Sequence, residues 1–469
     1  MKTLATFLCI AGLVHAISIV DFDTCSIPYI IPLILQNACD RSDEYLNPVN
    51  VENAEDISVI GIAPPNNITA AGIRTTPNRW THEPFCIESA EANNGFCVYT
   101  NDRFANGRGI SIVTTPKEVA SLLEAAAFKE PSDSEIFKHP EGNAYKQQPQ
   151  VIPGKGRGVL ANATLNRGDY LQGYTPILLF QDDFMQFVKL DDRDLLIRLA
   201  IQRLSPKTQE LFNSLHNHFP GDPSVSRIKT NAFQAYAGAA KDHFWAIIPE
   251  AARYNHDCRP NTAYYFDKDS LTHRIHAMTR INPGEEITVT YTPGGMKHAE
   301  RRTFIEREWG FKCTCSKCSA PKSLVELADL RLDTIKQIEK ELNDISPRRT
   351  ATTATAETLV SLYEQEHLYT QIGQAYMYAA LEYSYIGDKD GLRKWVPLAL
   401  EALALWKGES HQFYRSMVVL SVAPEEHRSW KYIVNGFTLN DGSKIEPLKP
   451  VSQRVLAPGG QEIEALTAA

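Results

Sequence analysis

The stretch Asn-His-Asp-Cys-Arg-Pro-Asn, residues 255–261, decides the fold of this chain. Three other features accompany it in a fixed order: Gly-Lys-Gly-Arg-Gly-Val at 154–159, Gly-Glu-Glu-Ile-Thr-Val-Thr-Tyr at 284–291 and Cys-Thr-Cys-Ser-Lys-Cys at 313–318. A lone histidine is more often a satisfied core residue than a functional one, so His256 gains weight only from its neighbours. The order of the four features therefore says more than any one of them.

In these four features the chain resembles the SET-domain lysine methyltransferases, most closely the SMYD-like group and its fungal relatives. The resemblance covers about residues 145–319. The motifs at 255–261, 284–291 and 313–318 together are highly specific, because chance can supply one of them but hardly all three in register. It implies an α+β fold with a SET-domain β-fold, a helical insert and a zinc-bound post-SET segment. It also implies S-adenosylmethionine as cofactor and a protein or peptide substrate that presents a lysine. Asp257 stands where the family usually has serine.

The glycine-rich feature alone is a weak signal, because such turns also occur at nucleotide phosphates. No Ser or Thr directly follows Lys155, and residues 159–161 are typical of a strand rather than a helix, which argues against a phosphate cradle. A plain tight turn before a strand remains the alternative. The resemblance implies cofactor contacts by Lys155, Gly156 and Arg157, with the two cations meeting the cofactor carboxylate.

The resemblance also implies roles for residues in the other motifs. Asn255 and His256 bind the cofactor, and Tyr291 is the catalytic tyrosine, which also contacts the cofactor. Phe233 lines the lysine channel, while Phe311 and Trp309 pack against the adenine. Methyl transfer needs an in-line approach of a neutral amine, so a tyrosine hydroxyl acts by orienting that amine. Core packing is the alternative for all the aromatic residues.

Three cysteines lie within six positions, Cys313, Cys315 and Cys318, and structural zinc needs four ligands. By resemblance, Cys258 is the fourth zinc ligand and ties residues 255–261 to the post-SET segment. A disulfide among these cysteines is the competing interpretation.

The first residues have the form of a secretory signal, with Lys2, an apolar run at 4–14 and Ala16 at the exit. The run is too short to span a bilayer, and no later stretch is long enough. We expect a signal peptide at 1–16 and a secreted or secretory-pathway protein. A buried N-terminal element in a cytoplasmic or nuclear enzyme is the alternative.

Residues 17–130 contain Cys25, Cys39, Cys86 and Cys97, an even number that allows two disulfides in an oxidising compartment. Four free buried thiols are the alternative. This region is expected to be rich in loops, with a strand near 109–113 and a helix over 117–128.

Short β-type runs and a helical insert at 181–230 predict an α+β SET domain at 145–292, followed by a post-SET zinc segment at 304–319. The expected strands cover 158–161, 170–180, 244–248, 263–266, 274–278 and 287–291. A helical domain at 323–431, with blocks at 324–342, 353–386 and 392–406, resembles a tetratricopeptide array and is expected to form one wall of the substrate cleft. Residues 435–469 are expected to be irregular.

The composition is typical of a globular protein that can bury a sizeable core, because 43% of the 469 residues are hydrophobic and 22% are charged. The formal charge of -8 argues against a broad basic face for nucleic acid. A catalytically silent SET-like scaffold that binds proteins in the secretory pathway is the second functional hypothesis, because secreted proteins rarely meet ample S-adenosylmethionine. The sequence determines neither the oligomeric state nor the number of methyl groups transferred.

Overall fold

The computed structural model describes residues 79–87, 95–129, 141–238, 243–346, 349–432, 452–456 and 462–466. The predicted signal at 1–16, Cys25 and Cys39 lie outside these residues. The chain forms two compact units, one from Met1–Glu124 with Ile177–Ile247 and one from Ala125–Pro176 with Ile248–Ala469. The predicted division into consecutive domains stays a prediction. No helix among the described residues is long and apolar enough to cross a membrane.

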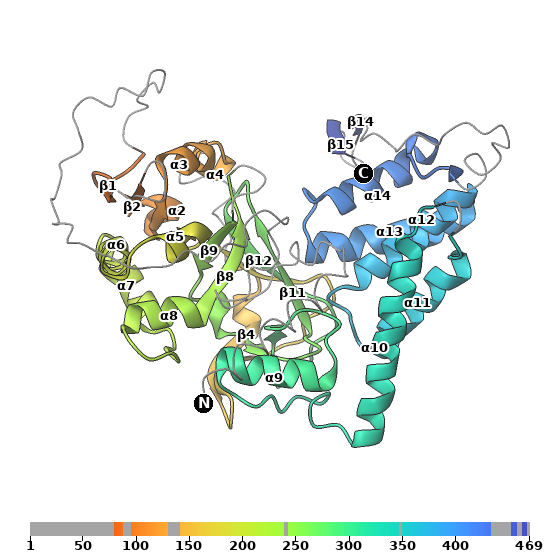
Figure 1. The fold of residues 1–469 in the computed structure, drawn as a ribbon, viewed down its shortest axis with the longest axis horizontal. Helices are drawn as coiled ribbons and strands as arrows, with labels where there is room; N and C mark the ends of the chain where they lie inside the picture. The colour runs from red at the N-terminus through yellow and green to blue at the C-terminus, as the bar shows by residue number, and fades with distance from the viewer. Residues whose placement is uncertain are drawn as a thin grey trace, which may run out of the picture. The chain divides into compact units, whose positions relative to one another are not determined.

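The first unit is a six-stranded sheet with helices (Figure 1). Its strand order is β1 (Phe85–Ile87), β2 (Phe96–Asn101), β3 (Ile110–Thr114), β7 (Leu178–Gln181), β9 (His243–Ile247) and β8 (Ala232–Tyr236). Within this sheet β3 and β7 pair in parallel, and the other neighbouring strands pair antiparallel. Cys86 and Cys97 lie opposite each other on β1 and β2 and form a disulfide, one of the two bonds that the cysteine count allowed.

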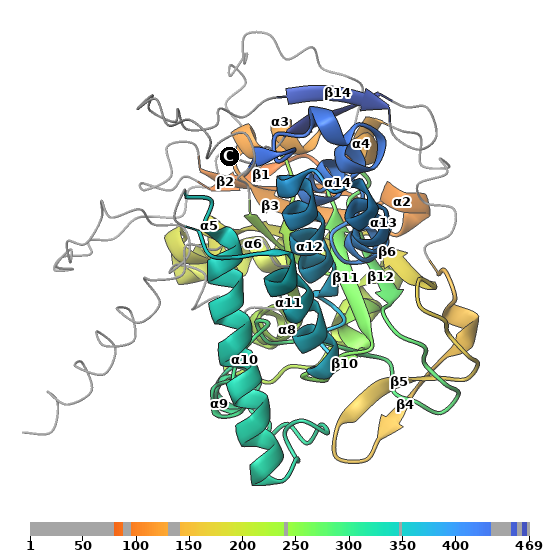
Figure 2. The same ribbon diagram turned by 90° about the vertical axis from the view of Figure 1, so that its right-hand side faces the viewer.

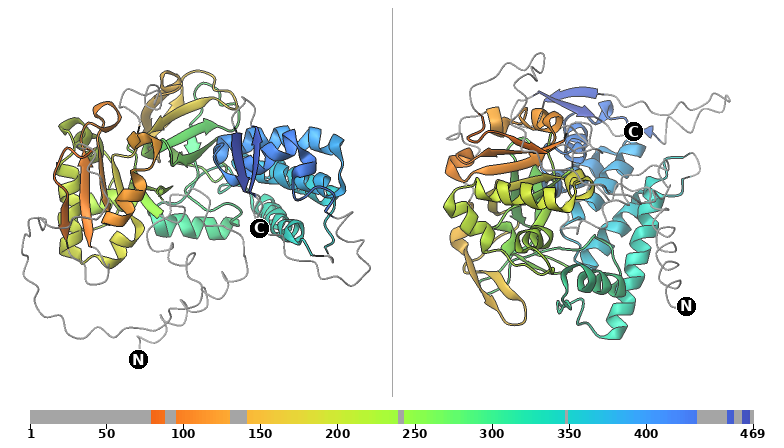
Figure 3. Two further views of the ribbon diagram at one scale, coloured as in Figure 1. Left: turned by 90° about the horizontal axis from the view of Figure 1, so that it is seen from above. Right: turned by 60° about the vertical axis from the view of Figure 1, so that its left-hand side comes forward.

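The helical insert predicted at 181–230 contains four helices of the first unit, seen in yellow to green in Figure 3. They are α5 (Asp182–Phe187), α6 (Leu190–Gln202), α7 (Pro206–Asn213) and α8 (Pro223–Asn231), while α2 (Phe104–Gly107) and α3 (Pro116–Leu122) lie earlier in the chain. Ser205 caps α7 and Asp222 caps α8. Each helix also has proline in its first turn, where a backbone N–H would have no hydrogen-bond partner within the helix.

The described residues of the second unit hold four small sheets, one of which is the hairpin of the C-terminal tail given below. The hairpin of β4 (Gln147–Ile152) and β5 (Gly156–Ala161) is antiparallel, as is the sheet of β11 (Thr262–Asp267), β12 (Thr272–Ala277) and β6 (Tyr170–Tyr174). Two short strands, β10 (Asn255–His256) and β13 (Thr288–Val289), pair in parallel. Short helical turns precede strands of this unit in the chain: α4 (Ala126–Lys129) and η4 (Ala144–Lys146) come before β4, and η5 (Ala251–Arg253) comes before β10.

Helices follow the strands of the second unit from α9 (His298–Trp309) onward. Figure 2 shows α10 (Lys322–Asn343), α11 (Thr353–Gln365) and α12 (Ile372–Ile386) side by side, and each packs against the next. They continue into α13 (Lys389–Trp406), α14 (Gln412–Val422) and η6 (Pro424–Glu426), and α13 also packs against β11 and β12. The C-terminal helical region predicted at 323–431 is therefore present, whereas its likeness to tetratricopeptide repeats stays a prediction.

Several predicted elements have different bounds in the structure. The strand expected over 170–180 is two strands in different sheets, because Pro176 has no N–H for a ladder. The helix expected over 117–128 ends at Leu122, and beyond it the Ala127 N–H donates to the Asp269 carbonyl instead of continuing the helix. The tail expected to be irregular contains the hairpin of β14 (Ser452–Leu456) and β15 (Glu462–Leu466).

The helical block expected over 353–386 is likewise two helices. His367 adopts the left-handed backbone conformation, with φ of 56°, directly after Glu366 at the end of α11. The Leu368 N–H then donates to the Tyr363 carbonyl at 2.9 Å. Many helices end in this way. The break directs Glu366, at the end of α11, toward other elements.

Candidate functional site

The parallel pairing of β10 with β13 brings two of the sequence motifs together. Asn255 lies opposite Thr288, and His256 lies opposite Val289. Asn261 reinforces the pair, because its Nδ2 donates to the Glu286 carbonyl at 2.8 Å and its Oδ1 accepts from the Thr288 N–H at 2.9 Å. Residues 255–261 and 284–291 therefore form one assembly.

Tyr291 lies beyond the end of β13 and is positioned at both its backbone and its side chain. Its N–H donates to Nδ1 of His256 at 2.9 Å, and its hydroxyl donates to the Tyr254 carbonyl at 2.8 Å. The strand expected over 287–291 stops at Val289, since the Tyr291 N–H bonds to the histidine ring instead of to a neighbouring strand. Burial raises the pKa of the Tyr291 hydroxyl well above its usual value, so the phenol is neutral near pH 7.

His256 is buried and joins Tyr291 to the cysteines. A backbone N–H can only donate, so Nδ1 of His256 is an acceptor and the ring proton of the neutral imidazole lies on Nε2. Nε2 is 3.2 Å from the Cys258 sulfur, which places an N–H···S hydrogen bond there. Burial lowers the pKa of His256 to about 3, so the ring is neutral near pH 7.

All four predicted metal ligands lie together in the structure. The sulfurs of Cys258, Cys313, Cys315 and Cys318 are buried and lie within 4.8 Å of one another, and none of these cysteines is in a disulfide. The Cys258 sulfur is 4.0 Å from that of Cys313 and 3.5 Å from that of Cys318. Tetrahedral zinc with bonds of about 2.3 Å needs sulfurs about 3.8 Å apart, so the donor set fits zinc.

The glycine-rich turn leads into β5. The carboxylate of Glu286, which the sequence prediction did not single out, contacts the predicted cofactor residues Lys155 and Asn255. Glu286 accepts from Lys155 Nζ at 2.5 Å and from Asn255 Nδ2 at 2.9 Å. Partial burial lowers the pKa of Lys155, but the hydrogen bond and charge of Glu286 leave it above its usual value. Gly158 lies against the same groups, because a Cβ atom there would be 2.5 Å from Asn255 Nδ2.

The remaining predicted residues are placed as follows. Gly156 has φ of 74°, which favours glycine, and Arg157 is exposed on β5. Burial lowers the pKa of Arg253, and so does the positive charge of Arg157 nearby.

Two predicted aromatic residues surround His256 and Tyr291. The Trp309 ring is 5.3 Å from that of Tyr291, and the partly exposed Phe311 ring is 6.5 Å from that of His256. Phe233 is buried on β8, in the first unit, whereas the other predicted site residues belong to the second.

Asp257, where the family usually has serine, accepts the Arg259 N–H at 2.8 Å. This side-chain bond closes a turn over residues 257–259. A serine hydroxyl can close a turn in the same way. The departure in sequence therefore leaves a turn of the same kind.

Comparison with known proteins places the motifs at 255–261 and 284–291 in one domain. The family model described as SET domain matches residues 156–292. The fission yeast protein "Histone-lysine N-methyltransferase set5" is 29% identical over 194 residues, 41% of this chain and 56% of that protein. Zebrafish "N-lysine methyltransferase SMYD2-B" is 26% identical over 29% of this chain and 31% of its own length. The matched part therefore spans about half of the first relative and less of the second.

Proposed function

We propose that this chain, whose residues 156–292 form a SET domain, transfers a methyl group from S-adenosylmethionine to a lysine side chain of a protein. One observation carries the proposal: β10 and β13 bring Asn255 and His256 together with Tyr291. The names of the SET relatives, which are histone-lysine or N-lysine methyltransferases, agree with it.

Lys155, Arg157 and Asn255 are the groups that we assign to the cofactor. The cofactor is an amino acid derivative with a carboxylate and an ammonium group. The cations at 155 and 157 suit its carboxylate, whereas Glu286 and the Asn255 side chain suit its ammonium. Glu286 holds Lys155 and Asn255 in place before anything binds, which reduces the ordering entropy of binding.

Tyr291 orients the amine rather than removing its proton. S-adenosylmethionine supplies a methyl group on a positively charged sulfur, so the reaction depends on the line of approach of a neutral amine. The Tyr291 O–H is committed to the Tyr254 carbonyl, and its oxygen lone pairs therefore remain to accept from the amine or from polarised methyl hydrogens. With its raised pKa the phenol is no base near pH 7, and water reached through the channel takes the lysine proton.

The four cysteines are proposed to hold one structural zinc ion. Their number, burial and spacing suit tetrahedral thiolate coordination. A positive charge acts on the cluster, because the Arg301 guanidinium interacts with Cys258, Cys315 and Cys318, which suits a centre of net negative charge.

Calorimetric titration of the full purified chain with S-adenosylmethionine tests the proposal, with the zinc content read on the same sample. Saturable binding at one site and one zinc per chain are expected. Absence of cofactor binding by a folded, zinc-containing chain would contradict the methyltransferase and favour the scaffold hypothesis. Screening a lysine-containing peptide array with labelled cofactor then identifies the substrate.

We also propose passage through the secretory pathway, which the paired Cys86 and Cys97 on β1 and β2 support, since disulfides persist in oxidising compartments. Expression in a eukaryotic host and assay of medium and cell fractions test this. A chain that stays in the cytosol with both thiols free would contradict it.

A further inference from the structure

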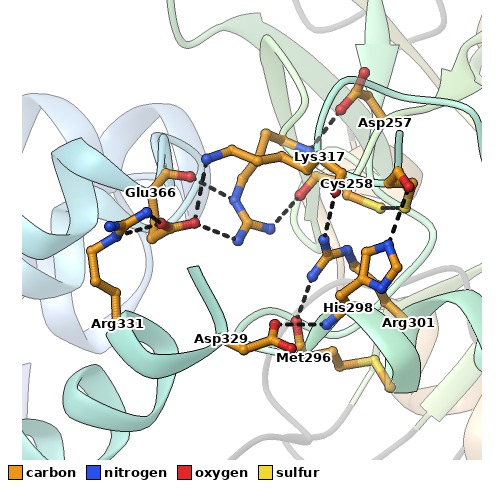
Figure 4. Close-up of polar contacts among 11 residues, drawn as sticks. Asp257, Cys258, Met296, His298, Arg301, Lys317, Asp329, Arg331 and Glu366 are labelled. Atoms are coloured by element: carbon orange, nitrogen blue, oxygen red, sulfur yellow. Dashed lines mark hydrogen bonds and ion pairs between the residues drawn. The ribbon is translucent and has the colours of Figure 1, made fainter. Parts of the chain in front are cut away.

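A buried glutamate at the end of α11 connects the helical region to both segments that carry the cysteines (Figure 4). Glu366 has a fully buried side chain, and its two oxygens face three cations. Oε1 accepts from Arg331 Nε at 2.6 Å, while Oε2 is 3.3 Å from Lys317 Nζ and 3.4 Å from Arg259 Nη2. The Glu366 carbonyl accepts a further bond from Arg259 Nε at 2.6 Å.

The three cations come from three different places in the second unit. Arg331 lies on α10, Arg259 follows Cys258, and Lys317 precedes Cys318. Arg259 also donates from Nη1 to the Cys258 carbonyl at 2.8 Å. A single carboxylate of the helical region thus contacts both segments from which the cysteine side chains project.

The charges at Glu366 are unequal, because one carboxylate faces three cations. Burial raises the pKa of Glu366, but the Arg331 hydrogen bond and the Lys317 and Arg259 charges outweigh it and lower the pKa overall. Removing the carboxylate would leave the buried Arg259 guanidinium without its counter-charge, which is far more damaging than losing a surface ion pair. The Arg259 and Lys317 side chains would then move, together with the backbone that bears the cysteines.

We infer that Glu366 is a positioning residue through which the helical region sets the geometry of the cysteine cluster. Cys258 is in turn linked by His256 to the Tyr291 backbone, so the same contact supports the tyrosine of the site. This last step rests on the proposed function, whereas the effect of Glu366 on the cluster does not. Groups that orient metal ligands from outside typically change metal affinity about 10- to 100-fold when they are replaced.

The chain offers a matched control in Glu382 on α12. This glutamate is also buried and forms an ion pair with one buried guanidinium, that of Arg349. Arg349 donates in addition to the Asp344 and Ala351 carbonyls, which belong to the helical region. Glu382→Gln therefore perturbs a buried ion pair of the helical region without touching Arg259 or Lys317.

The experiment compares zinc release from the full chain to a chromogenic chelator for wild type, Glu366→Gln and Glu382→Gln. We expect release about 10-fold or more faster in Glu366→Gln and close to wild type in Glu382→Gln, with Tm lowered in both. Lys317→Gln, at a partly exposed position, should also accelerate release, and it keeps the test decisive if Glu366→Gln does not fold.

Equal release rates in wild type and Glu366→Gln, or equal acceleration in both glutamate variants, would overturn the inference. So would a wild-type chain that holds no zinc. Failure of the wild type to bind S-adenosylmethionine would instead contradict the proposed methyltransferase activity. The two outcomes are distinguishable, because the zinc-release comparison does not use the cofactor.

Discussion

The backbone N–H of Tyr291 donates to Nδ1 of His256 at 2.9 Å, and the opposite ring nitrogen lies 3.2 Å from the sulfur of Cys258. One imidazole therefore connects the tyrosine of the site to the cysteine cluster. A ring with two different partners has a fixed orientation and a fixed tautomer, as is usual for groups around a metal centre.

The first prediction is that His256 is a neutral imidazole with its proton on Nε2. Nitrogen-15 NMR of the labelled, metal-loaded chain should show an unprotonated Nδ1 and a protonated Nε2 at neutral pH. His256→Phe keeps a ring but loses both bonds, and we expect metal affinity to fall about 10- to 100-fold. A protonated Nδ1, or unchanged metal affinity in the variant, would contradict this.

The second prediction concerns the Tyr291 hydroxyl. Tyr291→Phe removes the O–H that bonds to the Tyr254 carbonyl, and we expect methyl transfer to fall about 100-fold or more, as for other groups that stabilise a transition state. The affinity for S-adenosylmethionine, measured by calorimetry, should change little, since the assigned cofactor groups stay in place. Tyr265→Phe on β11 is the control and should keep its activity; equal losses in the two variants would argue against a specific role of Tyr291.

The sequence singles out candidate site residues because these residues lie inside short motifs. The ordered motifs carry a resemblance that implies roles for Asn255, His256 and Tyr291. The same resemblance adds Cys258 to the three cysteines that are close together in the sequence. Asn261 and Glu286 lay inside the same motifs, but their bonds depend on how residues 255–261 pair with 284–291 in space. Pairing of distant segments is not visible in hydrophobic period or propensity.

Glu366 shows where prediction from sequence ends. It is 107 positions from Arg259, at the end of a helix whose break at His367 was not predicted. The break has no glycine or proline to mark it, and the helical pattern continues on both sides. Tertiary contacts, here three cations around one carboxylate, outweighed the local preference for helix.

The third prediction uses the space beside Gly158. A Cβ atom at this position would lie 2.5 Å from Asn255 Nδ2 and 3.1 Å from Glu286 Oε1, and it would also collide with Ile152 Cδ1. Gly158→Ala should therefore separate Asn255 from Glu286 and weaken S-adenosylmethionine binding by about 10-fold, or about 1.4 kcal/mol.

Gly168 gives the control for this substitution. It has φ of 89°, and a Cβ atom added there would have no neighbour within 4 Å, so Gly168→Ala strains the backbone without moving another group. We expect it to lower Tm but to leave cofactor affinity at the wild-type value. Equal affinities in the two variants would mean that Asn255 and Glu286 do not shape the cofactor site.

The fourth prediction is a loss of stability on mild acidification, carried by buried His427. Its Nδ1 accepts the Ser429 N–H at 3.2 Å and its Nε2 is 2.9 Å from Ser416 Oγ. Burial, and then the charge of Arg428, lowers the pKa of His427 to about 4 in the folded chain, whereas the unfolded value is about 6.5. Between these pH values the unfolded chain binds more protons, so the free energy of unfolding falls as pH falls, by at most about 1.4 kcal/mol per pH unit from this residue.

Denaturant titrations of the full chain at pH 7, 6 and 5 measure this dependence. His427→Gln keeps polar partners for the two serines but cannot be protonated, so its free energy of unfolding should fall less steeply with pH than that of the wild type. His218→Gln makes the same substitution at an exposed position of the first unit and is the control; its curve should follow that of the wild type. Identical slopes in wild type and His427→Gln would show that protonation of His427 does not lower the free energy of unfolding.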